Sequence, residues 1–154
     1  MPKWDMPPVA KVYEALSAVA DGRVTLTGET SANVLSSERD KTYTVKWSAD
    51  GPGITSNDNA TRWQGYIGYP IIAALMQAGR IPFSRAAADA LAGVPWHALN
   101  KQYKRDYDAA VAQVLKEVEG AGGDAEAIRR EAERIYEALA ALGLERPAPK
   151  PPRQ

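Results

Sequence analysis

The sequence of 154 residues contains no cysteine and a single histidine, His97. Without cysteine there can be no disulfide, no thiolate zinc site, no iron–sulfur cluster and no cysteine nucleophile. A single histidine also excludes a metal site built from several histidines, so only oxygen ligands would be available to a metal ion. From the sequence we therefore predict no metal site and no cofactor.

Net charge and long hydrophobic runs are also absent. Nineteen basic residues balance nineteen acidic residues, so no overall field would attract nucleic acid or an anionic membrane. The longest uninterrupted apolar run, residues 71–76, is too short to span a bilayer, and no apolar signal-peptide segment follows residues 1–8. These absences predict a cytoplasmic protein without a membrane segment.

The length suits one compact domain, which we place at residues 9–146. Residues 1–8 are expected to be extended or disordered, and the proline-rich residues 147–154 are expected to form a disordered tail. Within the domain, residues 9–58 are expected to form a helix and a sheet, because their hydrophobic period changes along the segment. Residues 59–146 are expected to be helical.

The first half of the domain carries a helical pattern followed by strand patterns. Apolar residues at spacings of three and four predict a helix over residues 9–20. Alternating apolar and polar residues predict strands over 24–27 and 42–47, with a short third strand near Ile54. The polar residues 36–41 then favour an antiparallel hairpin between the first two strands. The expected result is a small meander of about three strands.

The second half is rich in alanine and carries helix start and stop signals. These signals predict helices over residues 70–79, 84–92, 95–119 and 124–142. The last two helices carry continuous apolar stripes and are joined by a glycine-rich linker, which predicts an antiparallel helical hairpin. This hairpin packs either on its own domain or against a second copy in a homodimer. The predicted fold class is α+β.

Residues 56–70 form the segment most suited to a binding site. Four small polar residues are followed by three aromatic residues interleaved with glycines, between the sheet and the next helix. The competing interpretation is structural: Thr61 and Gln64 form a capping box, and the aromatic residues cover the core. The residues that we predict to bind a small polar ligand or a protein partner are Ser56, Asn57, Asp58, Arg62, Trp63, Tyr66 and Tyr69.

Two other functions stay open. His97 is the one side chain that titrates near neutral pH when unperturbed, so the first alternative is an enzyme acting on a small polar substrate through Asp58, Arg62 and His97. The second alternative is a weak nucleic-acid binder that uses Lys101, Lys104 and Arg105 on one side of a long helix. Since no nucleophile with its base is visible, the leading hypothesis is a non-catalytic binding or interaction module.

Overall fold

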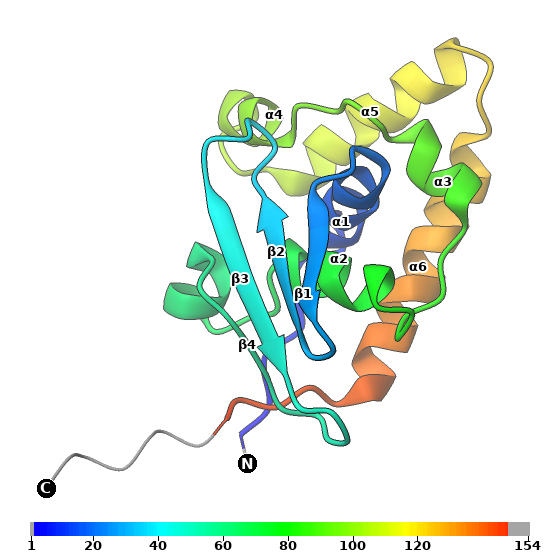
Figure 1. Cartoon of the computed structure of the whole chain (residues 1–154). Helices are drawn as coiled ribbons and strands as arrows, with labels where there is room; N and C mark the ends of the chain where they lie inside the picture. The colour runs from blue at the N-terminus through cyan, green and yellow to red at the C-terminus, as the bar shows by residue number, and fades with distance from the viewer. Residues whose placement is uncertain (1, 148–154) are drawn as a thin grey trace, which may run out of the picture.

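The structure, a computed structural model, describes residues 2–147 and packs a four-stranded antiparallel sheet against a group of helices (Figure 1). The predicted α+β fold class is confirmed. The tail predicted for residues 147–154 lies outside the described residues, apart from Pro147. The elements in chain order, with η1 a short π-helical turn, are α1 (Ala10–Ala20), β1 (Val24–Gly28), β2 (Ser31–Leu35), β3 (Thr42–Trp47), β4 (Ile54–Ser56), η1 (Ala60–Gln64), α2 (Tyr69–Gln77), α3 (Arg85–Ala90), α4 (Trp96–Gln102), α5 (Tyr107–Gly120) and α6 (Ala125–Leu142).

The sheet is a meander in the order β1-β2-β3-β4, one strand more than the sequence predicted. The additional strand is β2, which pairs with β1 on one side and with β3 on the other. It therefore separates the two strands that were expected to pair directly. Its sequence, Ser-Ala-Asn-Val-Leu, has little strand propensity of its own, and hydrogen bonds from both neighbours fix its conformation.

Helix α2 lies between the sheet and α1 and forms the centre of the core. Its residues from Pro70 to Met76 are all buried, and it packs against all four strands. Helix α1 is also buried on every side, because α3, α5 and α6 cover the part of its surface that α2 does not contact. The two charged residues of α1, Lys11 and Glu14, are consequently buried with it.

The helical half follows the predicted start signals but divides the longest predicted helix. Ser84 accepts a hydrogen bond from the backbone nitrogen of Ala87 at the start of α3, and Asp124 accepts one from Ala127 at the start of α6. Both are the N-caps that the sequence predicted. The single helix expected over residues 95–119 is instead two helices, α4 and α5.

The division between α4 and α5 comes from left-handed backbone at Lys104 and Arg105, whose φ angles are 53° and 67°. Asp106 then starts α5 by accepting a hydrogen bond from the nitrogen of Ala109 at 3.1 Å. Apolar residues continue at helical spacing across this break, so the periodicity did not reveal it. Lys101 therefore lies on α4, whereas Lys104 and Arg105 lie in the connection that follows it, so the three residues do not share one helix.

The left-handed position of Lys104 gives a first prediction. A non-glycine residue in this conformation costs about 1–2 kcal/mol, whereas glycine adopts it freely. We expect Lys104→Gly to leave the free energy of unfolding unchanged or to raise it by up to about 1 kcal/mol. The matched control Lys101→Gly, inside α4, should lower it by about 1 kcal/mol. Urea unfolding of both variants tests this, and equal losses would contradict it.

Helices α5 and α6 form the predicted antiparallel hairpin (Figure 1). The side chains of Ile128, Ala132, Ile135 and Leu139 on α6 are buried, as the apolar stripe indicated. Both helices pack on α1 of their own domain. Pairing of this hairpin with a second copy stays a prediction.

The two terminal segments lie side by side at the β4 edge of the sheet (Figure 1). The backbone nitrogen of Trp4 donates to the carbonyl of Leu144 at 3.0 Å, and that of Ile54 donates to the carbonyl of Glu145 at 3.1 Å. Residues 2–4 are therefore held in place by residues 144–146, and Asp5 is held by its bridge to Tyr66.

Candidate functional site

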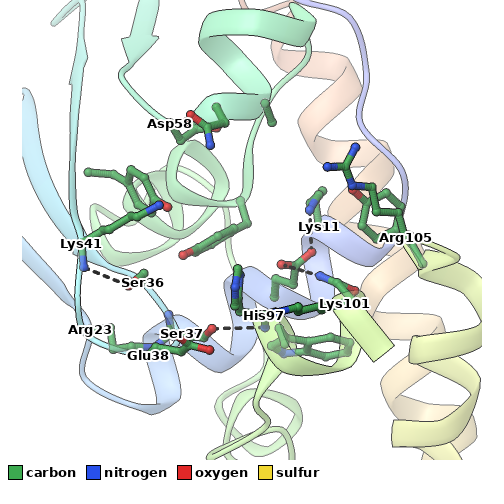
Figure 2. A pocket seen from close by; sticks show the side chains of 18 of the residues that line it. Lys11, Arg23, Ser36, Ser37, Glu38, Lys41, Asp58, His97, Lys101 and Arg105 are labelled. Atoms are coloured by element: carbon green, nitrogen blue, oxygen red, sulfur yellow. Dashed lines mark hydrogen bonds and ion pairs between the residues drawn. The ribbon is translucent and has the colours of Figure 1, made fainter. Parts of the chain in front are cut away.

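A cavity of about 530 Å³ lies where the β2–β3 turn and the end of the sheet meet the helical half (Figure 2). We call it the polar cavity. Its walls come from α1, from residues 36–43, from residues 58–69 and from α4 with the start of α5. These segments are far apart in the sequence, so the cavity exists only in the folded chain.

A buried ion pair on α1 forms one wall of the polar cavity. The side chains of Lys11 and Glu14 approach to 2.9 Å between Nζ and Oε2, and the two residues are only 8% and 5% exposed. Asn100 on α4 donates from Nδ2 to Glu14 Oε1 at 3.4 Å. Burial raises the pKa of the Glu14 carboxyl above its ordinary value, and the Lys11 ammonium beside it opposes part of that rise.

Arg23 contributes a second buried cation to the polar cavity. The residue is 2% exposed and lies between α1 and β1. Its Nη1 donates to the carbonyl of Leu35 at 2.9 Å, and its Nε lies 3.5 Å from Asp21 Oδ2. The guanidinium is therefore held in one position by strand β2 and by the end of α1.

Buried polar atoms without a hydrogen bond gather in this cavity. Within residues 2–147, the buried side-chain atoms without a hydrogen bond are Glu14 Oε2, Arg23 Nε and Asn100 Oδ1, and all three residues line the polar cavity. Glu14 Oε2 and Arg23 Nε have the ionic contacts described above. Asn100 Oδ1 has neither a hydrogen bond nor an ionic contact. An unsatisfied buried polar atom costs about 1–3 kcal/mol. A polar ligand that donates a hydrogen bond to Asn100 Oδ1 would remove this cost at that atom.

Tyrosine side chains supply further walls of the cavity. Burial raises the pKa values of Tyr43, Tyr66 and Tyr69 above the ordinary tyrosine value. Their hydroxyls therefore stay protonated at neutral pH and act as hydrogen-bonding groups. The rings of Tyr43 and Tyr69 meet edge to face, with centroids 6.3 Å apart and planes at 89°. These contacts give a polar cavity with aromatic sides.

Asp58 holds together the turn between β4 and α2. Its carboxylate accepts hydrogen bonds from the hydroxyl of Ser56, from the nitrogen of Thr61 at 3.1 Å and from the hydroxyl of Thr61 at 2.9 Å. The Thr61 hydroxyl in turn accepts from the nitrogen of Gly68 at 3.2 Å. The side chain that caps this turn is thus Asp58, in place of the capping box considered for Thr61 and Gln64.

The structure divides the predicted binding residues between two hollows on either side of η1. Asp58, Tyr66 and Tyr69 line the polar cavity. Ser56, Asn57 and Arg62 line a second hollow, next to strands β3 and β4. Trp63 lines neither of these two hollows and is 75% exposed.

The residues of the enzyme hypothesis are also divided between the two hollows, and two of the three residues of the nucleic-acid hypothesis line the polar cavity. His97 lines the polar cavity with Asp58, and its backbone nitrogen donates to Ser37 Oγ at 3.2 Å (Figure 2). Arg62 lies at the second hollow, so the three residues of the enzyme hypothesis do not share one cavity. Of the three basic residues considered for nucleic acid, Lys101 and Arg105 line the polar cavity.

Sequence reasoning missed the buried polar residues Lys11, Glu14, Arg23 and Asn100. One signal was available for two of them. Within α1, Lys11 and Glu14 are the two charged residues among eleven. A helix that is apolar on nearly all sides is buried on all sides, so its charges must be buried and paired. No comparable local signal marks Arg23 or Asn100.

The fold and the cavity define a small α+β protein with a polar cavity between its sheet and its helical half. The chain belongs to the family described as uncharacterised conserved protein UCP014422, whose sequence model matches residues 4–145. No curated protein and no solved structure matches the chain. Among residues 2–147, no group of three or more histidine, aspartate or glutamate side chains could hold a metal ion. None of the helices in that range is both long and apolar enough to cross a membrane.

Proposed function

We propose that the protein is a binding module that takes a small polar ligand into the polar cavity. The observation that carries this proposal is the convergence of the buried polar groups of Glu14, Arg23 and Asn100 on that cavity, where Asn100 Oδ1 has no partner at all. Its volume of about 530 Å³ is within the range of small-molecule sites. Charges of both signs line it, so the ligand that fits best carries both hydrogen-bond donors and acceptors, as zwitterions and nucleosides do.

The energetic cost of the buried charges supports the same proposal. Taking an ion out of water costs several kcal/mol, and a buried ion pair recovers that cost only when its geometry is very good. A protein that needed only to fold could place apolar residues at Lys11 and Glu14, since α1 is otherwise apolar. Costly polar groups that persist in a cavity favour a role in recognition.

A ligand screen with one matched pair of variants tests the proposal. The full chain would be screened by thermal shift against amino acids, dicarboxylates, nucleosides and monosaccharides, and positive compounds would be mapped by amide chemical shifts. We expect Asn100→Ala to weaken binding about tenfold or more, because it removes the unpartnered amide oxygen Oδ1. The control Gln102→Ala, on the exposed side of the same helix, should bind as the unmodified protein does.

Two results would contradict the proposed function. One is that no compound of the panel raises the melting temperature. The other is that positive compounds bind equally well to Asn100→Ala and perturb amides far from Lys11, Arg23 and Asn100.

A catalytic role is the second candidate, and one observation favours it. Burial in a cavity raises the pKa of the Glu14 carboxyl above its ordinary value, and a shift in this direction suits a carboxyl group that donates a proton to a substrate. Incubating a compound found in the screen with the protein, and following it by NMR, separates the two roles. An unchanged compound supports a binding module, whereas conversion that disappears in Glu14→Gln supports catalysis.

A further inference from the structure

The second hollow is strongly basic, and we call it the basic hollow. It measures about 420 Å³ and lies where the terminal segments meet β3, β4 and η1. Three cationic side chains line it, Lys46, Arg62 and Arg146, and its lining contains no aspartate or glutamate. Within residues 2–147, no ion pair joins any of the three to a carboxylate. The polar cavity, in contrast, holds charges of both signs.

Arg146 is held in position at the basic hollow. Its guanidinium lies 4.5 Å from the centre of the Trp4 ring, and Trp4 Nε1 donates to the carbonyl of Ile54 at 2.8 Å. Arg146 Nη2 donates to the carbonyl of Gly65 at 3.2 Å. A side chain at Gly65, whose φ is +73°, would collide with this guanidinium. The backbone therefore leaves room for the arginine and fixes its direction.

Arg62 and Lys46 come from the other two sides of the basic hollow. Arg62 lies on η1, beside the exposed ring of Trp63, with 5.9 Å between the guanidinium carbon and the ring centre. Lys46 lies on β3 opposite Thr55 of β4, whose side chain also lines the basic hollow. Two guanidinium groups, one ammonium and neighbouring hydroxyls surround the same space.

We infer that the basic hollow binds a phosphoryl group. Guanidinium groups match the oxygen geometry of phosphate, and three cations without acidic partners suit a group with more than one negative charge. The phosphoryl group could belong to a small phosphorylated compound or to the backbone of single-stranded nucleic acid. In the second case, the exposed Trp63 next to Arg62 offers a ring on which a base can stack. This site is separate from the polar cavity, so the inference does not depend on the proposed function.

Titration of the full chain with inorganic pyrophosphate at low ionic strength tests the inference. We expect saturable binding by calorimetry, with acetate at matched ionic strength giving none. Arg62→Gln and Lys46→Gln should each weaken binding about tenfold, because each removes a charged hydrogen-bond donor. The control Lys116→Gln removes one exposed positive charge from α5, outside the basic hollow, and should leave binding unchanged.

A second titration distinguishes the two sources of the phosphoryl group. A labelled oligothymidylate of ten nucleotides serves as the second probe. If it binds, and if Arg62→Gln and Trp63→Ala weaken its binding, the phosphoryl group belongs to a nucleic-acid backbone. Pyrophosphate binding without oligonucleotide binding indicates a small phosphorylated compound. The inference is overturned if neither probe binds, or if Lys116→Gln weakens binding as much as Arg62→Gln does.

Discussion

Replacement of Glu14 alone by leucine is expected to lower the free energy of unfolding by about 3–5 kcal/mol. The substitution would leave the Lys11 ammonium buried without its counter-ion, 2.9 Å from where the carboxylate oxygen was. The ring of Tyr107, 4.4 Å from Lys11 Nζ, would compensate only part of that loss. Chemical unfolding at neutral pH measures the effect.

The double variant Lys11→Met, Glu14→Leu provides the control for this prediction. Removing both charges together should restore the stability of the unmodified protein, or exceed it by up to about 4 kcal/mol, since apolar residues of similar size often replace buried ion pairs favourably. We expect this stable variant to lose the binding of polar ligands in the polar cavity. Additive losses from the two single substitutions would show that the pair is not coupled, and would contradict the prediction.

Gly68→Ala is expected to destabilise the protein by about 3 kcal/mol. A Cβ atom at Gly68 would lie 2.7 Å from Asp58 Cγ and 2.9 Å from Asp58 Oδ1. The carboxylate cannot withdraw without losing its hydrogen bonds from Ser56 and Thr61. The substitution should therefore detach the turn before α2, and with it one wall of the polar cavity.

Gly120→Ala is the matched control for Gly68→Ala. Gly120 is the last residue of α5, and a Cβ atom there would meet nothing within 4 Å. Alanine favours the helix over glycine by about 1 kcal/mol, so this variant should be as stable as the unmodified protein or slightly more stable. A Gly68→Ala variant with an unchanged thermal transition would show that Asp58 can move freely, against the expectation.

The predictable parts of the fold are those in which one segment carries its own signal. The caps at Ser84 and Asp124 and the apolar stripe of α6 were found in this way, because local hydrogen bonds and helical spacing decide them. Strand β2 and the break at Lys104 could not be predicted from local signals. The strand depends on its two neighbours, and the break lies within a continuous apolar pattern.

The candidate site was predictable only in part, for a similar reason. Tyr66 and Tyr69 stand out because aromatic residues alternate with glycines in one loop, and both do line the polar cavity. Asn100 lies 86 residues from its partner Glu14, and a contact of that kind leaves no local trace in the sequence. The chemistry of the cavity is thus a product of the tertiary fold.

The hydrogen bond between β4 and Glu145 has a consequence for synthesis of the chain. The amide of Ile54 donates to the carbonyl of Glu145, so the β4 edge of the sheet is covered here by a residue that is synthesised about ninety residues after Ile54. Until that residue leaves the ribosome, the nascent protein exposes an open strand border, the kind of surface at which unfinished chains associate with one another.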